Sequence, residues 1–171
     1  RQARLVASCY EGSDLRAQKY PESDGLIRRL VAQHAGGAEA RHGVNAWDLR
    51  RSFGDSQRWD IIAWNHPHLG TEDFKLHRFL LAHFFHSAKQ DLRPGGLVVL
   101  SVVQGQAERW ELLRQAERQG LALACAPEPF EAMEWPGYEC KRNTTGRSFK
   151  NLHSQRQATS AMRSWTYHLG R

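Results

Sequence analysis

Cysteine is scarce in this chain, and its few cysteines lie far apart. Only three of the 171 residues are cysteine, Cys9, Cys125 and Cys140, and no two of them form a Cys-x-x-Cys pair. A zinc site is therefore not expected, and the odd number without a regular spacing favours reduced thiols inside a cell. No apolar run is long enough to cross a bilayer, and we expect no signal peptide within these residues. The chain begins with Arg1 instead of methionine, so we expect that an upstream segment was removed or never included.

Acidic residues are outnumbered by basic ones. The sequence holds 18 Asp and Glu against 24 Lys and Arg, which gives a formal charge of +6 and a pI of about 9.6. This balance suits a polyanion such as RNA as partner, although a basic protein with solvated arginines has the same composition. The nine histidines form no set with carboxylates at metal-ligand spacing, so no metal site is predicted.

Short apolar segments alternate along the chain with amphipathic ones. The segments expected to be strands are 4–10, 39–44, 58–64, 97–103, 121–126 and 164–169, and those expected to be helices are 13–18, 25–34, 46–53, 75–92 and 108–119. In the longest helix we expect one apolar stripe of Leu76, Phe79, Leu80, His83, Phe84, Ala88 and Leu92. The alternation predicts one α/β domain over 1–171 with a mostly parallel sheet and helices on both faces. Residues 142–163, rich in Arg, Ser, Thr, Gln and Asn, are expected to form a mobile basic connection.

The most informative stretch is Trp59–Gly70. The first part of this stretch is apolar on both faces, as in a parallel strand of a covered sheet. It stops abruptly at Asn65-His66-Pro67-His68-Leu69-Gly70. Ligands of doubly wound sheets bind at the carboxyl ends of the strands. We therefore expect this turn to open into a ligand crevice.

Several stretches, in order from about residue 5 to 150, resemble one family. Leu92–Leu100, with Arg93-Pro94-Gly95-Gly96, resembles the helix–turn–strand of Rossmann-like, SAM-dependent methyltransferases. Four further stretches resemble, more specifically, the 25S rRNA (uridine-N3)-methyltransferase-like family. They are Ala7–Glu11 followed by Lys19-Tyr20-Pro21, His42–Ala46, Asp60–Gly70 with its Asn-x-Pro-His-x-Gly, and Trp135–Glu139. The resemblance implies a class I methyltransferase fold with S-adenosyl-L-methionine (SAM) as cofactor and ribosomal RNA as partner.

The resemblance also implies roles for individual residues. Glu11, where the family has Asp, keeps a carboxylate for the ribose hydroxyls, and Asn45, also replacing Asp, keeps an acceptor for the adenine amine. Ala46, Asn65 and Gly70 complete the expected cofactor contacts. In methylation of uridine N3, Asn65 would bind the uracil, Pro67 would fix the turn, and His68 would take the N3 proton. The structural alternatives are that Glu11 and His68 cap helices and that Asn45 is an ordinary turn residue.

RNA contacts are expected from aromatic and basic side chains. Trp64, His66, Trp135 and Tyr138 are candidates for stacking on a flipped base. The phosphate contacts are expected from Lys141, Arg142, Arg147, Lys150 and Arg156, with a solvated loop face as the alternative.

One expected half of the site is missing from the sequence. Members of the family open with a first strand and a Gly-Glu-Gly-Asp-Phe-Ser-Phe-like loop, and this chain contains neither. An empty central position would expose strand edges, so we expect a segment outside these residues, or a partner chain, to fill it.

Two functions follow. One is a SAM-dependent methyltransferase acting on N3 of an rRNA uridine. The other is an inactive RNA- or protein-binding scaffold in a ribosome or other ribonucleoprotein. The resemblance implies the nucleolus, with the mitochondrion as alternative.

Overall fold

The computed structural model describes residues 3–34, 37–131 and 163–171. Its strands are β1 (Leu5–Ser8), β2 (Ala38–Arg41), β3 (Trp59–Asn65), β4 (Leu92–Val103), β5 (Ala122–Leu123), β6 (Glu128–Pro129) and β7 (Ser164–Gly170). Its helices are α1 (Ser13–Lys19), α2 (Ser23–Gln33), α3 (Leu49–Phe53), α4 (Phe74–Asp91), α5 (Gln106–Arg109) and α6 (Leu112–Arg118). The predicted α/β alternation is confirmed.

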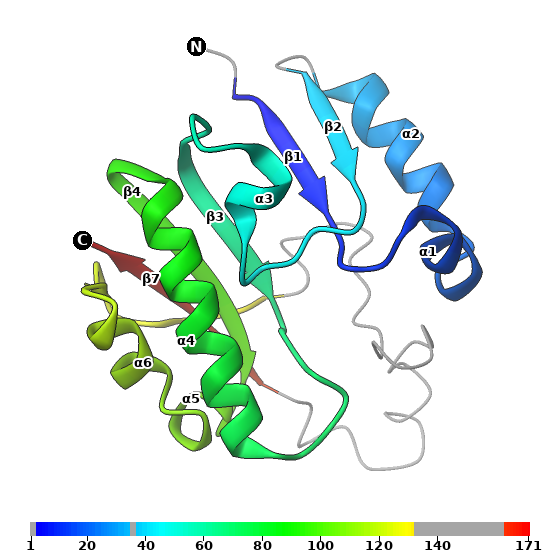
Figure 1. Ribbon diagram of the computed structural model, residues 1–171. Helices are drawn as coiled ribbons and strands as arrows, with labels where there is room; N and C mark the ends of the chain where they lie inside the picture. Colours follow the sequence, from blue (N-terminus) through cyan, green and yellow to red (C-terminus); the bar gives the residue numbers. More distant parts are fainter. Residues whose placement is uncertain (1–2, 35–36, 132–162) are drawn as a thin grey trace.

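The strands form two sheets that lie beside each other (Figure 1). In the smaller sheet β1 pairs in parallel with β2, and in the larger one the order is β3-β4-β7-β5, with β6 also paired to β7. The β3–β4 pair is parallel, whereas β7 runs antiparallel to β4, β5 and β6. From β1 the chain moves outward to β2, and from β3 it moves outward in the opposite direction to β4. This reversal is the topological switch point of a doubly wound fold.

The switch point lies between β1 and β3, where the described residues contain no strand. Each of the two strands has a hydrogen-bonded neighbour on its other side only, and their amino ends approach through Arg4 Nη1, which donates to Gln57 Oε1 at 3.5 Å. The sequence predicts a vacant first-strand position, and this position is the one at which the sheet is divided.

The division explains why β3 is less buried than its apolar sequence predicts. Ile61 is 60% exposed and Leu5 of β1 is 41% exposed, so the expectation that β3 is covered on both faces is wrong for this chain. No side chain of β1, β2 or α2 is buried in the described structure. An apolar strand edge of this kind is a template for another strand.

The core lies instead between the larger sheet and α4. Its members include Leu81, Phe84, Phe85, Leu100, Leu112 and Leu169, each 2% exposed or less. The predicted apolar stripe of α4 is partly wrong, because Leu76, Phe79 and His83 point outward while His77, Leu81 and Phe85 are buried. Asp73 caps the helix by accepting from the backbone N–H groups of Lys75 and Leu76, which sets where α4 starts after the β3 loop.

The predicted helix over 108–119 is interrupted. Glu111 adopts a left-handed backbone conformation with φ of 52°, and it separates α5 from α6. Trp110, immediately before the break, is 2% exposed and turns its indole toward the start of α4. The break therefore delivers an aromatic ring to the loop that follows β3.

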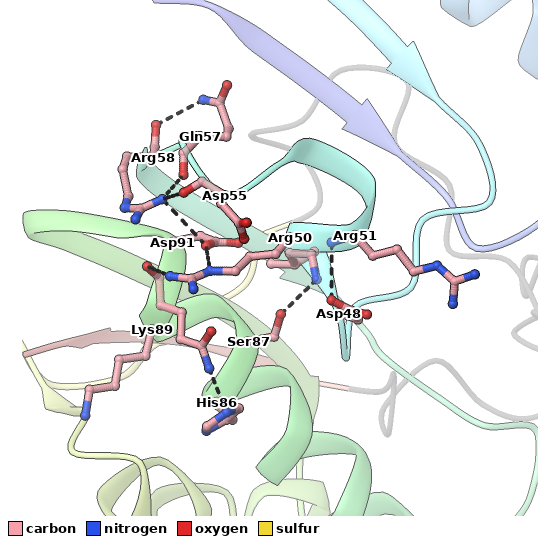
Figure 2. Close-up of polar contacts among 12 residues, drawn as sticks. Asp48, Arg50, Arg51, Asp55, Gln57, Arg58, His86, Ser87, Lys89 and Asp91 are labelled. Atoms are coloured by element: carbon pink, nitrogen blue, oxygen red, sulfur yellow. Dashed lines mark hydrogen bonds and ion pairs between the residues drawn. The ribbon is translucent and has the colours of Figure 1, made fainter.

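A polar cluster anchors α3 to the far end of α4 (Figure 2). Asp91, the last residue of α4, is fully buried, and its Oδ1 accepts from Arg50 Nε at 2.9 Å, with Arg58 Nη1 4.0 Å away. Ser87 Oγ accepts from the backbone N–H of Leu49 at 2.9 Å. These contacts fix the segment between β2 and β3 at the amino edge, opposite the candidate site.

Candidate functional site at the carboxyl edge

Three loops that carry predicted site residues follow the carboxyl ends of β1, β2 and β3. The three strands point the same way in Figure 1, so these loops share one edge of the fold. The first two are hydrogen-bonded to each other, because the Gly43 N–H donates to the Glu11 carbonyl at 3.1 Å and the Val44 N–H to the Cys9 carbonyl at 2.9 Å. The switch point opens on this same edge between β1 and β3, which is where ligands of doubly wound sheets bind.

Glu11 lies just after β1 as an ionised carboxylate. Its Oε1 accepts from Lys19 Nζ at 2.6 Å, and both side chains are less than one-fifth exposed. Burial alone would raise the pKa of the Glu11 carboxyl, but the hydrogen bonds from Lys19 and the backbone, with the lysine charge, hold it below its ordinary value. The carboxylate is therefore charged at neutral pH and able to accept from hydroxyl groups.

Cys9 precedes this carboxylate at the end of β1. Its Sγ lies 3.2 Å from His42 Nδ1, in the loop after β2. Burial, together with the charge of Glu11, raises the pKa of the Cys9 thiol, with Arg16 opposing the shift. Cys9 and Cys125 are free thiols.

Asn45 and Ala46 lie in the loop after β2. Asn45 is exposed, and its Oδ1 accepts from the backbone N–H of Trp47 at 3.0 Å, which is an Asx turn of the kind that the structural alternative predicts. Ala46 packs against the core. A cavity of about 420 Å³ lies between this loop and α3, lined by residues 41–45, 48, 51 and 52. Arg41 and Arg51 line this cavity together with the carboxylate Asp48.

The loop after β3 is held in an unusual conformation. Asn65 is exposed at the strand end, Pro67 is buried, and His66 between them has φ of 54°. Positive φ is uncommon for a residue other than glycine and concentrates at functional sites. The His66 N–H donates to the Ser101 carbonyl at 2.8 Å, and its Nε2 lies 2.9 Å from Ser164 Oγ. Burial lowers the pKa of His66, which favours the neutral ring at neutral pH.

His68 continues the loop and is partly buried. Its Nδ1 accepts from the backbone N–H of Gly70 at 2.9 Å, and its Nε2 lies 3.9 Å from a carboxylate oxygen of Glu72. Burial, then the neighbouring His77, lowers the pKa of His68, while Glu72 opposes this. The ring is therefore neutral, and the Gly70 hydrogen bond assigns its proton to Nε2.

Two residues to which the sequence analysis gives no role in the site complete this loop. The His77 ring is fully buried and stacks on Trp110 with centroids 4.2 Å apart at 8°, and it also lies 4.7 Å from the His68 ring. His77 Nδ1 donates to the Asp73 carbonyl at 2.8 Å, and Nε2 accepts from the Leu69 N–H at 3.3 Å. The one sequence signal for His77 is its spacing of four residues from the helix-capping Asp73, which places it on the first turn of α4.

Two of the predicted base-stacking rings contact aromatic side chains of the chain itself. Trp64 packs edge-on against Phe84 in the core at 4.7 Å, and His66, within the β3 loop, packs edge-on against Phe130 at 5.1 Å. The other predicted RNA contacts, at Trp135, Tyr138, Lys141, Arg142, Arg147, Lys150 and Arg156, lie outside the described residues, as does nearly all of the predicted basic connection. Within the described part of the chain, no three His, Cys, Asp or Glu side chains are grouped to hold a metal ion, and no helix is long and apolar enough to span a bilayer.

Comparison with known proteins decides the family. The model of the family described as rRNA (uridine-N3-)-methyltransferase BTM5-like matches residues 1–142. The chain belongs to this family. A curated relative, an uncharacterized protein of Arabidopsis thaliana, is 28% identical over 156 residues, which cover 84% of this chain and 72% of that protein.

Solved methyltransferases share the fold at low sequence identity. TrmN from Thermus thermophilus superposes with a TM-score of 0.53 at 17% identity, covering 99% of this chain but only 44% of TrmN. The glycopeptide N-methyltransferase MtfA in complex with sinefungin gives 0.57 at 9% identity, covering 99% of this chain and 81% of MtfA. These likenesses confirm the Rossmann-like methyltransferase fold, and this chain spans less than half of the TrmN structure.

Proposed function

We propose that this chain is part of a SAM-dependent rRNA methyltransferase that methylates N3 of a uridine. The family match over residues 1–142 supports the class of reaction and the RNA. The observation that carries the proposal is the convergence of Glu11, Asn45 and the Asn65–Gly70 loop on one carboxyl edge beside the switch point.

The residues present fit the adenosine half of SAM. An ionised carboxylate suits the two ribose hydroxyls, and the Asn45 amide, whose oxygen has a second lone pair, suits the adenine amine. Ala46 and Gly70, whose side chains are small or absent, would complete the contacts with the cofactor. The donors for the methionine half would come with a parallel strand between β1 and β3, followed by a glycine-rich loop, and we propose that a segment of the same polypeptide outside these residues supplies both.

The β3 loop would handle the uracil. When bound, SAM supplies a methyl group on a sulfonium sulfur. Asn65 would orient a uracil carbonyl or accept from N3–H, and buried Pro67 would hold the turn rigid. In the tautomer set by Gly70, His68 would donate through Nε2 to a uracil oxygen, and the N3 proton would leave to solvent water as the methyl group bonds to the nitrogen. For His68 Nε2 itself to take that proton, the opposite tautomer is required.

Contacts with the RNA backbone are proposed for the basic segment beyond the described core. Lys141, Arg142, Arg147, Lys150 and Arg156 would meet phosphates, which position an RNA without reading its sequence. The proposed compartment is the nucleolus, with the mitochondrion as alternative; the +6 formal charge suits either.

Two assays on the full-length protein test this function. Calorimetric titration with S-adenosylhomocysteine is expected to show one site, and incubation with unmodified rRNA and SAM is expected to yield N3-methyluridine, which stops reverse transcription because the methyl blocks the pairing edge. Binding of S-adenosylhomocysteine without methylation of any rRNA would refute rRNA as the substrate. Absence of S-adenosylhomocysteine binding would refute the proposal that the protein is a SAM-dependent enzyme.

A second function, an inactive RNA- or protein-binding scaffold, is favoured by one observation. Glu11 and Asn45 already have partners within the chain, namely Lys19 and the Trp47 N–H. A scaffold would bind rRNA with the salt dependence of phosphate contacts while S-adenosylhomocysteine leaves its melting temperature unchanged.

A further inference from the structure

The loop after β3 is tied to the rest of the fold by a buried histidine that the proposed chemistry does not use. Among the described residues in the first turn of α4, His77 is the only titratable side chain that is fully buried. Both ring nitrogens and one ring face have contacts: the Asp73 carbonyl at Nδ1, the Leu69 N–H at Nε2, and the Trp110 indole against the face.

These contacts define a single protonation pattern for the ring. Nδ1 faces a carbonyl oxygen and must carry the proton, whereas Nε2 faces an N–H and must be the acceptor. Neither nitrogen is placed to reach a substrate, so His77 is not a catalytic residue. What the ring holds is the backbone of Leu69, midway between His68 and Gly70.

The position of that backbone decides where His68 points. The Gly70 N–H that fixes the His68 tautomer belongs to the peptide unit directly after Leu69, and the His68 ring lies 4.7 Å from the His77 ring and 6.0 Å from Trp110. Upstream, the left-handed backbone of His66 holds the other side of the loop. A shift at Leu69 therefore moves the His68 imidazole, while Asn65 remains fixed by its strand.

We propose that His77 is a positioning residue of the methyl-transfer site: its neutral ring, clamped between α4 and Trp110, holds the Leu69 amide and so fixes the direction of His68. This inference rests on the proposed function for its effect on catalysis, but its effect on the loop does not depend on that function.

Two substitutions in the full-length protein separate the roles of the ring. His77→Phe keeps an aromatic ring against Trp110 and loses both hydrogen bonds, whereas His77→Gln keeps an acceptor that can reach the Leu69 N–H. His83→Phe is the matched control, since His83 lies on the same helix, is exposed and packs on Trp47 at 5.3 Å.

The first readout concerns the loop and requires no activity. In His77→Phe, hydrogen exchange at the Leu69 amide should accelerate by about tenfold or more, as expected for loss of a protecting hydrogen bond, with His77→Gln and His83→Phe close to wild type. In wild type, the nitrogen chemical shifts of the ring should report the Nδ1–H tautomer. An Nε2–H tautomer, or unchanged exchange at Leu69 in a folded His77→Phe protein, would overturn the inference.

The second readout concerns catalysis. His77→Phe should lower kcat by about tenfold to a hundredfold, the scale of a misplacement near 1 Å, with little change in KM for SAM, and His77→Gln should recover most of the loss. A KM effect alone would mean that His77 acts on cofactor binding and would refute the assigned role. If the wild-type protein transfers no methyl group, the proposed function fails, while the exchange and tautomer measurements still decide whether His77 holds the loop.

Discussion

The cluster in Figure 2 gives the sharpest prediction about stability, for the substitution Arg50→Met. Asp91 is fully buried at the carboxyl end of α4, where the helix dipole disfavours a negative charge, and its Oδ2 has no hydrogen-bond partner in the described structure. Arg50, 2.9 Å away, is its main compensation. Breaking a buried ion pair at one partner costs about 3–5 kcal/mol.

Two features of the cluster reduce that figure. The Arg50 side chain is 36% exposed, so water screens part of its attraction, and Arg58 remains 4.0 Å from Asp91 after the substitution. We therefore expect Arg50→Met to lower the free energy of unfolding by about 2–3 kcal/mol, measured by urea denaturation followed by circular dichroism.

The matched control removes the charge that is left behind. The double variant Arg50→Met, Asp91→Leu should lie within about 1 kcal/mol of wild type, because an apolar pair of similar volume replaces a buried ion pair at little cost. Additive losses in the double variant would refute this reasoning, since they would show that Arg50 contributes by packing and not by compensating Asp91.

Three further results are expected. Gly96→Ala should cost about 1–3 kcal/mol, because the new Cβ would lie 3.0 Å from two backbone carbonyl oxygens, whereas Gly25→Ala in α2, with open space around it, should gain about 0.5–1 kcal/mol; equal urea midpoints for the two variants would contradict this. Because burial lowers the pKa of His66, the unfolded chain takes up a proton on this residue before the folded protein does as the pH falls below about 6.5. The stability contributed by the neutral ring is therefore present above that pH and lost below it. His66→Gln should flatten the fall of the urea midpoint between about pH 7 and 5, and an unchanged slope would count against a buried neutral ring. Glu11→Gln in the full-length protein should weaken S-adenosylhomocysteine binding by about tenfold through loss of a charge-assisted hydrogen bond, and unaltered affinity by calorimetry would remove Glu11 from the site.

The periodicity of the sequence predicts most elements of the fold but less of their environment. The strands of the Rossmann-like sheet and α4 lie close to their predicted positions, since apolar runs and turn residues are local signals. The exposure of Ile61 is not local, because it depends on whether another strand lies beside β3. The outward face of α4 is missed for the same reason, since Leu76 and Phe79 fit a helical stripe as well as the buried residues do.

The candidate site shows the same division. Asn65, Pro67 and His68 are found from a contiguous motif, whereas Trp110 joins the site only through tertiary packing against His77, 33 residues earlier in the chain. The left-handed backbone of His66 is likewise imposed by contacts with Ser101 and Ser164, which sequence spacing does not indicate.

The central claim is that the carboxyl edge beside the switch point binds the cofactor. Hydrogen exchange of the full-length protein, measured with and without S-adenosylhomocysteine, tests it most directly. The account predicts new protection in the three loops around Glu11, Asn45 and Asn65–Gly70 together, with none at the Arg50–Asp91 cluster on the opposite edge. Protection confined to any other surface, or no change in these loops at saturating ligand, would contradict it.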